Sequence, residues 1–284
     1  MKIYAPAKIN LSLDIVGKRE DGYHLLRMIM ESLELSDELT ITKNSTGKIT
    51  TSTNSKFVPD NKKNLAYRTA ELVLNEYGIT DGVDIVIKKN IPVAAGLAGG
   101  STDAAAVIKG LNSIFDLKMD VDKMKALGLK IGADVPYCIE GGTALSEGIG
   151  EVLTPLRPLR KCPVILIKPD LGVSTKEVYT AYARVKEVRH PDTDALIKNI
   201  EETGFVSPEH MANVLEEVTI PMVPVIDDIK KDLMGKGAFV SMMSGSGPTV
   251  FALFEDEDVC GRVFREMKDK YRDMRVILTK TGGR

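Results

Sequence analysis

Apolar and polar residues alternate near the start of the chain, and this pattern predicts the first structural element. From residue 8 to residue 15 every second side chain is apolar, which is the period of a half-buried β-strand. Lys8 and Asn10 therefore share one face of the predicted strand. The ordinary interpretation of a lysine in such a position is a solvated strand face, so the alternation alone assigns it no function.

Three further patterns organise the first half of the chain. A helix is predicted over Leu65–Tyr77, preceded by Asn64, which is a favourable N-cap residue. A strand is predicted over Val83–Lys88, directly before a glycine-rich run. The polar stretch from Lys43 to Lys63 is interpreted as a pair of strands with a mobile loop.

The second half of the chain alternates short apolar runs with helical stretches, which suggests an antiparallel α+β layer. Residues 154–158, Thr-Pro-Leu-Arg-Pro, form a proline-punctuated connection. We therefore expect one domain over residues 1–156 and a second over residues 157–284. Strands are expected at Val164–Ile167, Phe239–Met243, Val250–Phe254 and Val276–Leu278, and helices near residues 175–189, 226–234 and 257–271.

The run from Ile91 to Ala106 joins a glycine-rich loop to an alanine-rich helix. Gly96, Gly99 and Gly100 leave backbone N–H groups free of a neighbouring Cβ, and the helix that follows presents the positive end of its dipole. This combination predicts a cradle for phosphate, and a glycine turn used only for tight packing is the alternative. The run lacks the Gly-Lys-Ser/Thr ending of a P-loop, and the protein-kinase signatures are absent from the sequence.

Asp134 is a second candidate for chemistry, because it follows a helical stretch over about Asp120–Ile131. Gly132 is placed to end that helix, and Pro136 is expected to prevent the chain from resuming it. The carboxylate is therefore expected in a rigid turn. A capping role or a solvated turn is as compatible with that position as catalysis is.

Composition narrows the class of partner. The 284 residues are 43% hydrophobic and 27% charged with a formal net charge of -2. This charge balance predicts no basic patch that could bind nucleic acid. Cys138, Cys162 and Cys260 are far apart and lack Cys-x-x-Cys spacing, which favours reduced thiols over disulfides or zinc. No signal peptide is recognised and no apolar run approaches the ~20 residues that span a bilayer. We expect a cytoplasmic protein without a membrane partner.

The glycine-rich run resembles the second motif of the GHMP kinases, Pro-x-x-x-Gly-Leu-Gly-Ser-Ser-Ala. Pro92 and Gly96-Leu97 match it directly, whereas Ala98 replaces the middle glycine and Gly99–Asp103 replaces the Ser-Ser-Ala ending. The resemblance implies binding of ATP, with Mg²⁺ as a cofactor. It also implies a two-domain α+β fold, with an N-terminal α/β domain of the ribosomal-protein-S5 type and a ferredoxin-like C-terminal domain. The residues implied in nucleotide binding are Pro92, Val93, Ala94, Ala95, Gly96, Leu97, Ala98, Gly99, Gly100, Ser101 and Thr102.

Further stretches resemble one branch of these kinases. They are residues 5–13 and 21–25 near the start, residues 132–136, and residues 243–249, and the resemblance runs in order from residue 2 to about residue 279. Members of this branch use ATP to phosphorylate the 2-hydroxyl of a methylerythritol linked to cytidine diphosphate, a step of the non-mevalonate route to isoprenoid precursors. The resemblance therefore implies a small-molecule kinase.

The branch also implies catalytic roles for two residues. The residue matching Lys8 lies beside the attacking hydroxyl, and the residue matching Asp134 orients and deprotonates that hydroxyl. Whether Asp134 acts as a base or mainly positions the alcohol and stabilises charge stays open. The superfamily serine that often touches the metal aligns with a glycine here, so the metal ligands are unknown, and Ser101 or Thr102 is the nearest hydroxyl.

Substrate binding is implied for Asn10, Tyr23, His24, Thr175 and Tyr179. Tyr23 suits stacking on cytosine, and His24 suits a hydrogen bond to its edge. A surface Tyr-His pair is the alternative. Thr175 and Tyr179 lie one helical turn apart, where a helix N-cap and a core aromatic are the ordinary roles.

The sequence leaves three alternatives open. Residues 244–248, Ser-Gly-Ser-Gly-Pro, resemble the third motif of the family and are expected to bring a second glycine turn against the first, unless they form a plain hairpin turn. A sister kinase acting on homoserine or a mevalonate-type acid would share these loops but would not need Tyr23 and His24. A non-enzymatic nucleotide-binding relative should have lost Lys8 or Asp134, and both are present.

Overall fold

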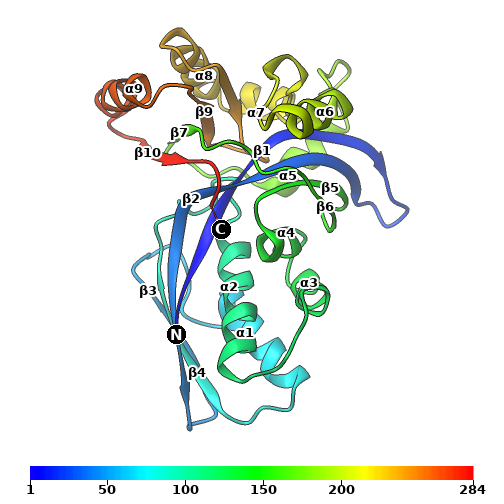
Figure 1. Ribbon diagram of the computed structural model, residues 1–284, viewed down its shortest axis with the longest axis vertical. Helices are drawn as coiled ribbons and strands as arrows, with labels where there is room; N and C mark the ends of the chain where they lie inside the picture. The colour runs from blue at the N-terminus through cyan, green and yellow to red at the C-terminus, as the bar shows by residue number, and fades with distance from the viewer. Residues whose placement is uncertain (284) are drawn as a thin grey trace. The chain divides into compact units, whose positions relative to one another are not determined.

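The computed structural model describes residues 1–283, and its contacts divide the chain into two compact units (Figure 1). Strands β1 (Lys2–Lys18) and β2 (His24–Asn44) contribute residues to both units. Each unit combines its own helices and strands, as the expected α+β class requires. The domain boundary after residue 156 stays a prediction. Unit 1 comprises Met1–Ala7, Leu35–Val93 and Ala98–Gly141, and unit 2 comprises Lys8–Glu34, Ala94–Leu97 and the chain from Gly142 onward.

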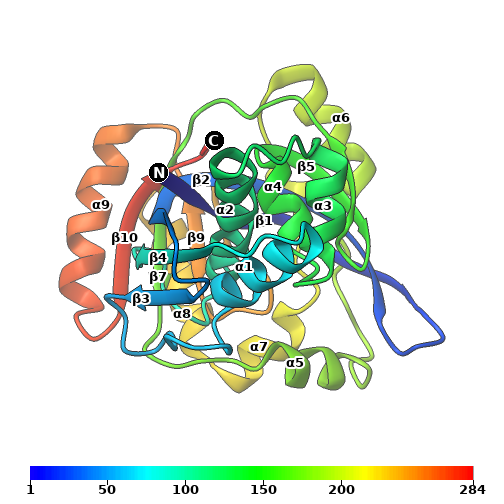
Figure 2. The same ribbon diagram turned by 90° about the horizontal axis from the view of Figure 1, so that it is seen from below.

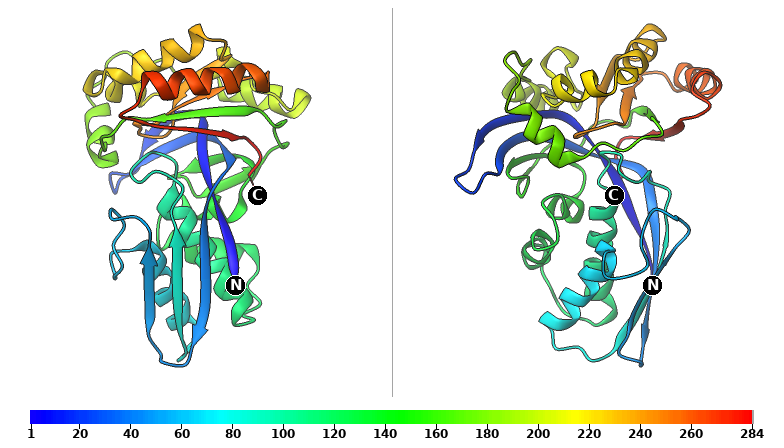
Figure 3. Two further views of the ribbon diagram at one scale, coloured as in Figure 1. Left: turned by 90° about the vertical axis from the view of Figure 1, so that its left-hand side faces the viewer. Right: turned by 180° about the vertical axis from the view of Figure 1, so that it is seen from behind.

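Unit 1 contains a sheet in which β4 (Gly82–Lys88) lies between β2 and β3 (Ile49–Thr53). The pair β2–β4 is antiparallel, and the pair β3–β4 is parallel. The strand pair expected within residues 43–63 is therefore wrong. The partner of β3 is β4. These two parallel strands are connected by a helical crossover, which is α1 (Leu65–Glu76). The helices on one side of this sheet (Figure 3) are α1 (Leu65–Glu76), α2 (Gly99–Ile114), α3 (Val121–Leu129) and α4 (Val135–Glu140).

Capping and small residues explain how α1 and α2 form and pack. Asn64 caps α1 as predicted, because its Oδ1 accepts a hydrogen bond from Ala66 N at 2.9 Å. α2 lies close to β2 at Gly110, where an added Cβ would be 2.6 Å from Ile41 Cδ1. Ala104, Ala105 and Ala106 of α2 are buried as well, and α2 packs against α1 and α4.

A turn separates α3 from α4, and Pro136 follows it. α3 begins after Asp120, whose Oδ1 accepts from Lys123 N at 2.7 Å, and it lies within the predicted helical stretch. As predicted, the chain does not resume α3, but a new helix outside the predicted set, α4, begins at Val135, and Pro136 lies in its first turn. A proline fits there because first-turn N–H groups have no helical acceptor. Asp134 is the residue directly before α4.

Unit 2 contains a four-stranded antiparallel sheet in the order β10-β7-β9-β8. Along the chain the order is β7, helices, β8, β9, α9 and β10, which is the βαββαβ connectivity of a ferredoxin-like layer. The expected antiparallel α+β layer is confirmed. Helices α8 and α9 pack on this sheet (Figure 2). The bounds are β7 Pro163–Lys168, α8 Val225–Gly235, β8 Val240–Met243, β9 Val250–Leu253, α9 Glu257–Lys270 and β10 Arg275–Lys280.

The connection from β7 to β8 holds more helix than the sequence predicts. α5 (Thr175–Tyr182) ends well before residue 189, the predicted end. Two helices and a short turn outside the predicted set follow it, and α6 buries only three of its residues, which leaves a weak apolar stripe. These elements are α6 Thr193–Thr203, the 3-10 turn Pro208–His210 and α7 Glu216–Met222.

The three cysteines are buried. Burial raises the pKa of Cys162 to about 11 and that of Cys260 to about 12, so both thiols are protonated at neutral pH. Protonated, buried thiols are poor nucleophiles, and these two therefore serve packing.

A buried carboxyl lies within β2, at the last residue that pairs with β5 (Thr143–Gly148). β5 pairs antiparallel with β2 and with β6 (Val152–Pro155). Buried Glu31 accepts hydrogen bonds from Thr143 Oγ1 at 2.6 Å and from Gly282 N at 2.9 Å. Burial raises the pKa of Glu31 to about 7, although both hydrogen bonds act in the opposite direction.

The stability of the protein should depend on pH through Glu31. Its pKa is raised from 4.5 in a free side chain to about 7 in the fold, so the folded state binds the proton more tightly. This contribution is fully present below about pH 4.5 and is lost as the pH rises through 7. Relative to Glu31→Gln, the wild type should lose about 3 kcal/mol of unfolding free energy over that window, measured by urea denaturation. A difference between the two proteins that stays constant with pH contradicts the assignment.

Candidate active site

Lys8 and Asn10 lie on one face of β1, as the alternation predicts. The Lys8 ammonium donates to Asn10 Oδ1 at 2.7 Å, and Asn10 Nδ2 lies 3.2 Å from Met28 Sδ of β2. Both residues are buried, with 5% of Lys8 and 1% of Asn10 exposed. The solvated strand face is therefore wrong for Lys8. A buried ammonium is costly, which favours a functional reason for its position.

Two glycine loops meet beside this pair within unit 2. Ser244 Oγ donates to Gly96 O at 3.0 Å, and a Cβ added to Gly96 would lie 2.2 Å from Ser244 O. A Cβ added to Gly245 would lie 3.3 Å from Gly96 O. The same atom would be 3.5 Å from Lys8 Nζ and 3.6 Å from Asn10 Oδ1. The expected contact between the loops is confirmed, and it requires residues without side chains.

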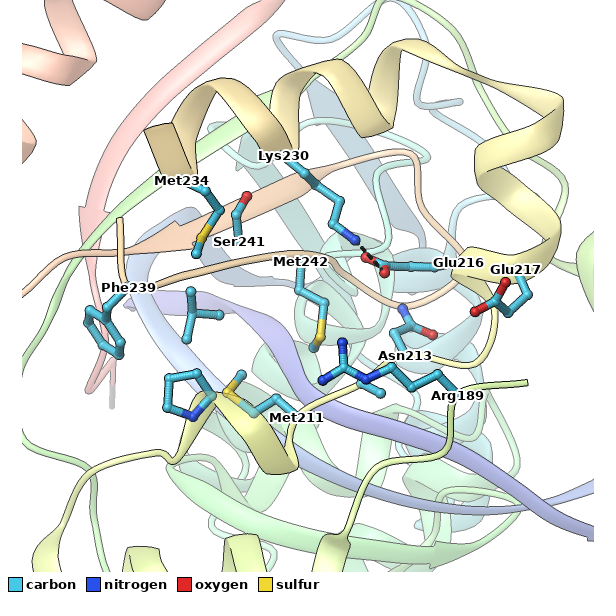
Figure 4. A pocket seen from close by; sticks show the side chains of 13 residues that line it. Arg189, Met211, Asn213, Glu216, Glu217, Lys230, Met234, Phe239, Ser241 and Met242 are labelled. Atoms are coloured by element: carbon cyan, nitrogen blue, oxygen red, sulfur yellow. Dashed lines mark hydrogen bonds and ion pairs between the residues drawn. The ribbon is translucent and has the colours of Figure 1, made fainter. Parts of the chain in front are cut away.

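Asn213 and Glu216 hold the second loop in place. Asn213 Nδ2 donates to Met243 O at 2.9 Å and to Gly245 O at 2.8 Å. Glu216 Oε1 accepts from Met243 N at 2.7 Å, while its Oε2 pairs with Lys230 Nζ at 2.5 Å (Figure 4). Both side chains line a pocket of about 280 Å³ within unit 2. Side chains outside the glycine motif therefore set the position of the loop backbone.

Helix α5 connects the second loop to the Tyr23-His24 turn. Thr175 is the first residue of α5, and its Oγ1 lies 2.8 Å from Ser246 Oγ. The rings of His24 and Tyr179 have centroids 5.3 Å apart and planes tilted by 35°. Tyr23 is 61% exposed. Four of the five residues implied in substrate binding therefore contact another part of the candidate site. Asn10 contacts Lys8, Thr175 contacts Ser246 of the second glycine loop, and the rings of His24 and Tyr179 contact each other. The fifth residue, Tyr23, exposes its ring to solvent.

The first turn of α2, in unit 1, has open backbone donors. Ala98 precedes the helix in the left-handed region, with φ of 57°, and no side chain among the described residues caps the helix there. The first intrahelical hydrogen bond runs from Thr102 N to Ala98 O at 2.9 Å. The N–H groups of residues 99–101 therefore have no helical acceptor, and a helix end of this kind favours an anion.

The residues implied in nucleotide binding are divided between the units. Residues 94–97 belong to unit 2, whereas residues 92–93 and 98–102 belong to unit 1. Thr102 is only 1% exposed, which leaves Ser101 as the more accessible hydroxyl. Nucleotide binding by these residues stays a prediction.

Asp134 lies in unit 1, in the turn before α4, and is half-buried. Its backbone is already helical, with φ of -78° and ψ of -14°, and no N–H group of α4 donates to its side chain. The capping role considered from the sequence is therefore wrong. Lys8 belongs to unit 2, and a joint role for the two residues stays a prediction.

A buried ion cluster, which the sequence patterns do not reveal, lies beneath the first turn of α2. Lys89 Nζ forms ion pairs with Asp37 and, at 2.7 Å, with Asp103 Oδ2. Asp103 belongs to the glycine-rich motif, but no pattern connects it with Asp37, which lies far away in sequence. No group of three or more His, Cys, Asp or Glu side chains able to hold a metal is found among residues 1–283.

Comparison with known proteins first identifies the class of protein to which the chain belongs. The model of the GHMP kinases N terminal domain matches residues 64–142, and the model of the GHMP kinases C terminal matches residues 185–273. A homoserine kinase from Cytophaga hutchinsonii shares the fold, with a TM-score of 0.77 at 20% identity over 100% of this chain and 94% of that one. The fold and the paired glycine loops are those of a GHMP small-molecule kinase.

More similar proteins narrow the class. A 4-diphosphocytidyl-2-C-methyl-D-erythritol kinase from Clostridium perfringens is 50% identical over 283 residues, which is 99% of this chain and 98% of the relative. A crystal structure of 4-(cytidine 5'-diphospho)-2C-methyl-D-erythritol kinase has a TM-score of 0.84 at 32% identity and covers 100% of both chains. The chain belongs to the 4-diphosphocytidyl-2-C-methyl-D-erythritol kinase family of the GHMP kinases.

Replacing Gly96 with alanine should break the contact between the two loops. The new Cβ would lie 2.2 Å from Ser244 O, and φ at this position is 72°. Gly22 is a matched control, because its φ is 90° but nothing lies within 4 Å of an added Cβ. Gly22→Ala should cost only backbone strain, about 1–3 kcal/mol. Gly96→Ala should cost about 1–3 kcal/mol more, the usual range for overpacking, measured as unfolding free energy. Equal losses would show that the loops are not in tight contact.

Proposed function

We propose that this protein transfers the γ-phosphoryl group of ATP to the 2-hydroxyl of 4-diphosphocytidyl-2-C-methyl-D-erythritol. The observation that carries the proposal is the buried Lys8–Asn10 pair set against two glycine loops. It occurs in a chain that is 50% identical over nearly its whole length to a kinase named for that substrate. Sequence resemblance supplies the substrate, and the geometry supplies groups suited to phosphoryl transfer.

The nucleotide phosphates are proposed to bind at the first turn of α2. The N–H groups of residues 99–101 are open, and the helix dipole favours negative charge at this end. Mg²⁺ typically keeps several waters and binds phosphates with only one or two protein ligands, which fits a site with a single accessible hydroxyl at Ser101. When bound, the metal would neutralise charge on the phosphates.

Lys8 and Asp134 are proposed as the catalytic residues. A loose phosphoryl-transfer transition state needs positioning and charge stabilisation more than covalent chemistry. The Lys8 ammonium is buried and held by Asn10, so its charge is held in one position and can stabilise a developing negative charge without reorganisation. Asp134 is proposed to orient the alcohol and to accept its proton.

Tyr23 and His24 are proposed to bind the cytosine. An exposed tyrosine ring offers a face on which a base can stack. Burial lowers the pKa of His24, and the charge of Lys18 lowers it further, so the imidazole is neutral at neutral pH. A neutral imidazole has one donor and one acceptor nitrogen, which suits a cytosine edge. The ring of Tyr179 lies against His24 and would fix its orientation.

Partners other than small molecules have no support from the described residues. None of their helices combines the length and the apolar character needed to cross a membrane. A cytoplasmic location and the absence of a nucleic-acid partner stay predictions from composition and charge.

A coupled ATP-turnover assay tests the proposed function. The cytidyl diphosphate substrate should support turnover that depends on Mg²⁺, whereas homoserine and mevalonate should not. Turnover with either control alcohol at a comparable kcat/KM, or none with the cytidyl substrate, would overturn the proposal.

The catalytic residues can be tested separately from folding. Asp134→Asn and Lys8→Met should each lower kcat by ~10²–10⁴, because a positioned base or a fixed charge is lost from the transition state. Calorimetry should show ATP affinity within a few fold of the wild type, and circular dichroism should show an unchanged fold. Near-normal turnover in both variants would remove these roles.

Cytosine recognition predicts unequal effects on the two substrates. Tyr23→Ala should raise KM for the cytidyl substrate by roughly 5–150-fold, the loss of one stacked base, and leave KM for ATP unchanged. His24→Ala should act in the same direction. Tyr4 is a matched control, because its side chain is also exposed, at 57%, and Tyr4→Ala should change neither constant. Equal effects of Tyr23→Ala on both substrates, or none, would argue against a cytosine site.

A further inference from the structure

A lysine ammonium is buried beneath the first turn of α2 within unit 1. Lys89 Nζ donates to Asp103 Oδ2 at 2.7 Å and to Gly99 O at 3.2 Å, and it also donates to Asp37 Oδ2. Lys89 is 8% exposed, Asp103 3% and Asp37 0%. One ammonium thus contacts two carboxylates and a backbone carbonyl of the helix.

The residues of this cluster come from three different segments. Lys89 directly follows β4, Asp37 belongs to β2, and Asp103 and Gly99 belong to the first turns of α2. Asp37 Oδ1 additionally accepts from Asn90 N at 2.6 Å and from Ile91 N at 2.8 Å, so it fixes the backbone that enters the glycine-rich run.

Burying the charges of this cluster carries a desolvation cost in free energy. Burial acts to lower the pKa of Lys89, but Asp103 and Asp37 outweigh burial, and the pKa lies above its ordinary value. Burial raises the pKa of Asp103 above its ordinary value. A buried ion pair often contributes no more stability than apolar residues of similar volume. A reason beyond stability is therefore needed.

Directionality supplies such a reason. Apolar packing is non-directional, whereas the Lys89 ammonium has three N–H donors and contacts three acceptors, Asp37, Gly99 O and Asp103 Oδ2. Ala98 precedes α2 in the left-handed region, and no side chain among the described residues caps the helix. The glycines at 99 and 100 add no Cβ to restrain the turn. Lys89, which directly follows β4, connects that strand to the first turn of α2 through its hydrogen bonds to Gly99 O and Asp103.

We propose that Lys89 is a positioning residue for phosphoryl transfer, which acts through Gly99 O and Asp103 to hold the first turn of α2 in one orientation toward the nucleotide phosphates. The inference rests on the proposed function, because it assumes that ATP is the anion at this turn. Without the contacts of Lys89 with Gly99 O and Asp103, the N–H groups of residues 99–101 adopt several orientations, and ATP then binds more weakly. Binding of the alcohol substrate is expected to be independent of this turn.

Substitutions at Asp103 separate orientation from charge. Asp103→Ala removes the acceptor from Lys89 while Asp37 still offsets the ammonium. Asp103→Asn keeps an oxygen for Lys89 and places its amide nitrogen where Oδ1 has no hydrogen-bond partner among residues 1–283. Lys88→Ala is the matched control, since that neighbouring lysine is exposed and pairs with Glu38 at 3.0 Å.

ATP affinity is measured by calorimetry on each folded protein, together with both KM values and kcat. Asp103→Ala should weaken ATP binding and raise KM for ATP by ~10–50-fold, with KM for the cytidyl substrate changed less than 2-fold. Asp103→Asn should restore ATP affinity to within about 3-fold of the wild type, and Lys88→Ala should leave every constant unchanged. If Asp103→Ala does not fold, Asp103→Ser replaces it, because its shorter side chain also withdraws the carboxylate.

The outcomes distinguish this inference from the proposed function. Unchanged ATP affinity in a folded Asp103→Ala or Asp103→Ser protein overturns the positioning role while wild-type turnover stands. An equal rise in both KM values, or an Asp103→Asn protein as impaired as the alanine variant, also overturns it. Absence of turnover with the cytidyl substrate in the wild type would instead remove the proposed function, and ATP calorimetry would still report on Lys89.

Discussion

The backbone donors in the first turn of α2 have neither a helical acceptor nor a side-chain cap among the described residues, and the anchoring of this helix follows from that. A helix end normally receives a side-chain cap, but here the residue before the helix is Ala98 in the left-handed region. The glycines that follow keep side chains away from the N–H groups. The helix is therefore anchored elsewhere, by its contacts with α1 and α4, by the close approach of Gly110 to Ile41 of β2, and by the Lys89 cluster below its first turn.

Unit 2 meets a related constraint with a different arrangement. Its two glycine loops approach so closely that a Cβ at Gly96 would overlap Ser244 O. Their contact places backbone rather than side chains next to Lys8 and Asn10. Asn213 secures the second loop through two carbonyl groups. In both units a polar side chain outside the glycine-rich motif fixes the backbone of that motif, Lys89 in unit 1 and Asn213 in unit 2. The glycines themselves have no side chains that could do so.

Local patterns made much of the fold and the site predictable. Strand alternation placed Lys8 and Asn10 on one face, Asn64 identified the start of α1, and the second glycine loop was expected against the first. Each of these rests on residues close in sequence or on a motif of defined spacing. The sheet of unit 2 was predictable as a set of apolar runs, although its order required the structure.

Features that depend on distant residues could not be predicted. Asp37, Lys89 and Asp103 come together only because β2 and β4 pair and α2 packs beside them, and no single segment carries that information. The new helix α4 was not predicted, because a proline that follows one helix is equally suited to the first turn of the next.

Binding of the nucleotide phosphates at the first turn of α2 can be followed by backbone amide NMR of the ¹⁵N-labelled protein during titration with ATP and Mg²⁺. We expect large shifts for the amides of residues 99–101, which saturate at the ATP concentration that saturates binding in calorimetry. If these amides stay unchanged while ATP binds, the phosphates do not bind at this turn.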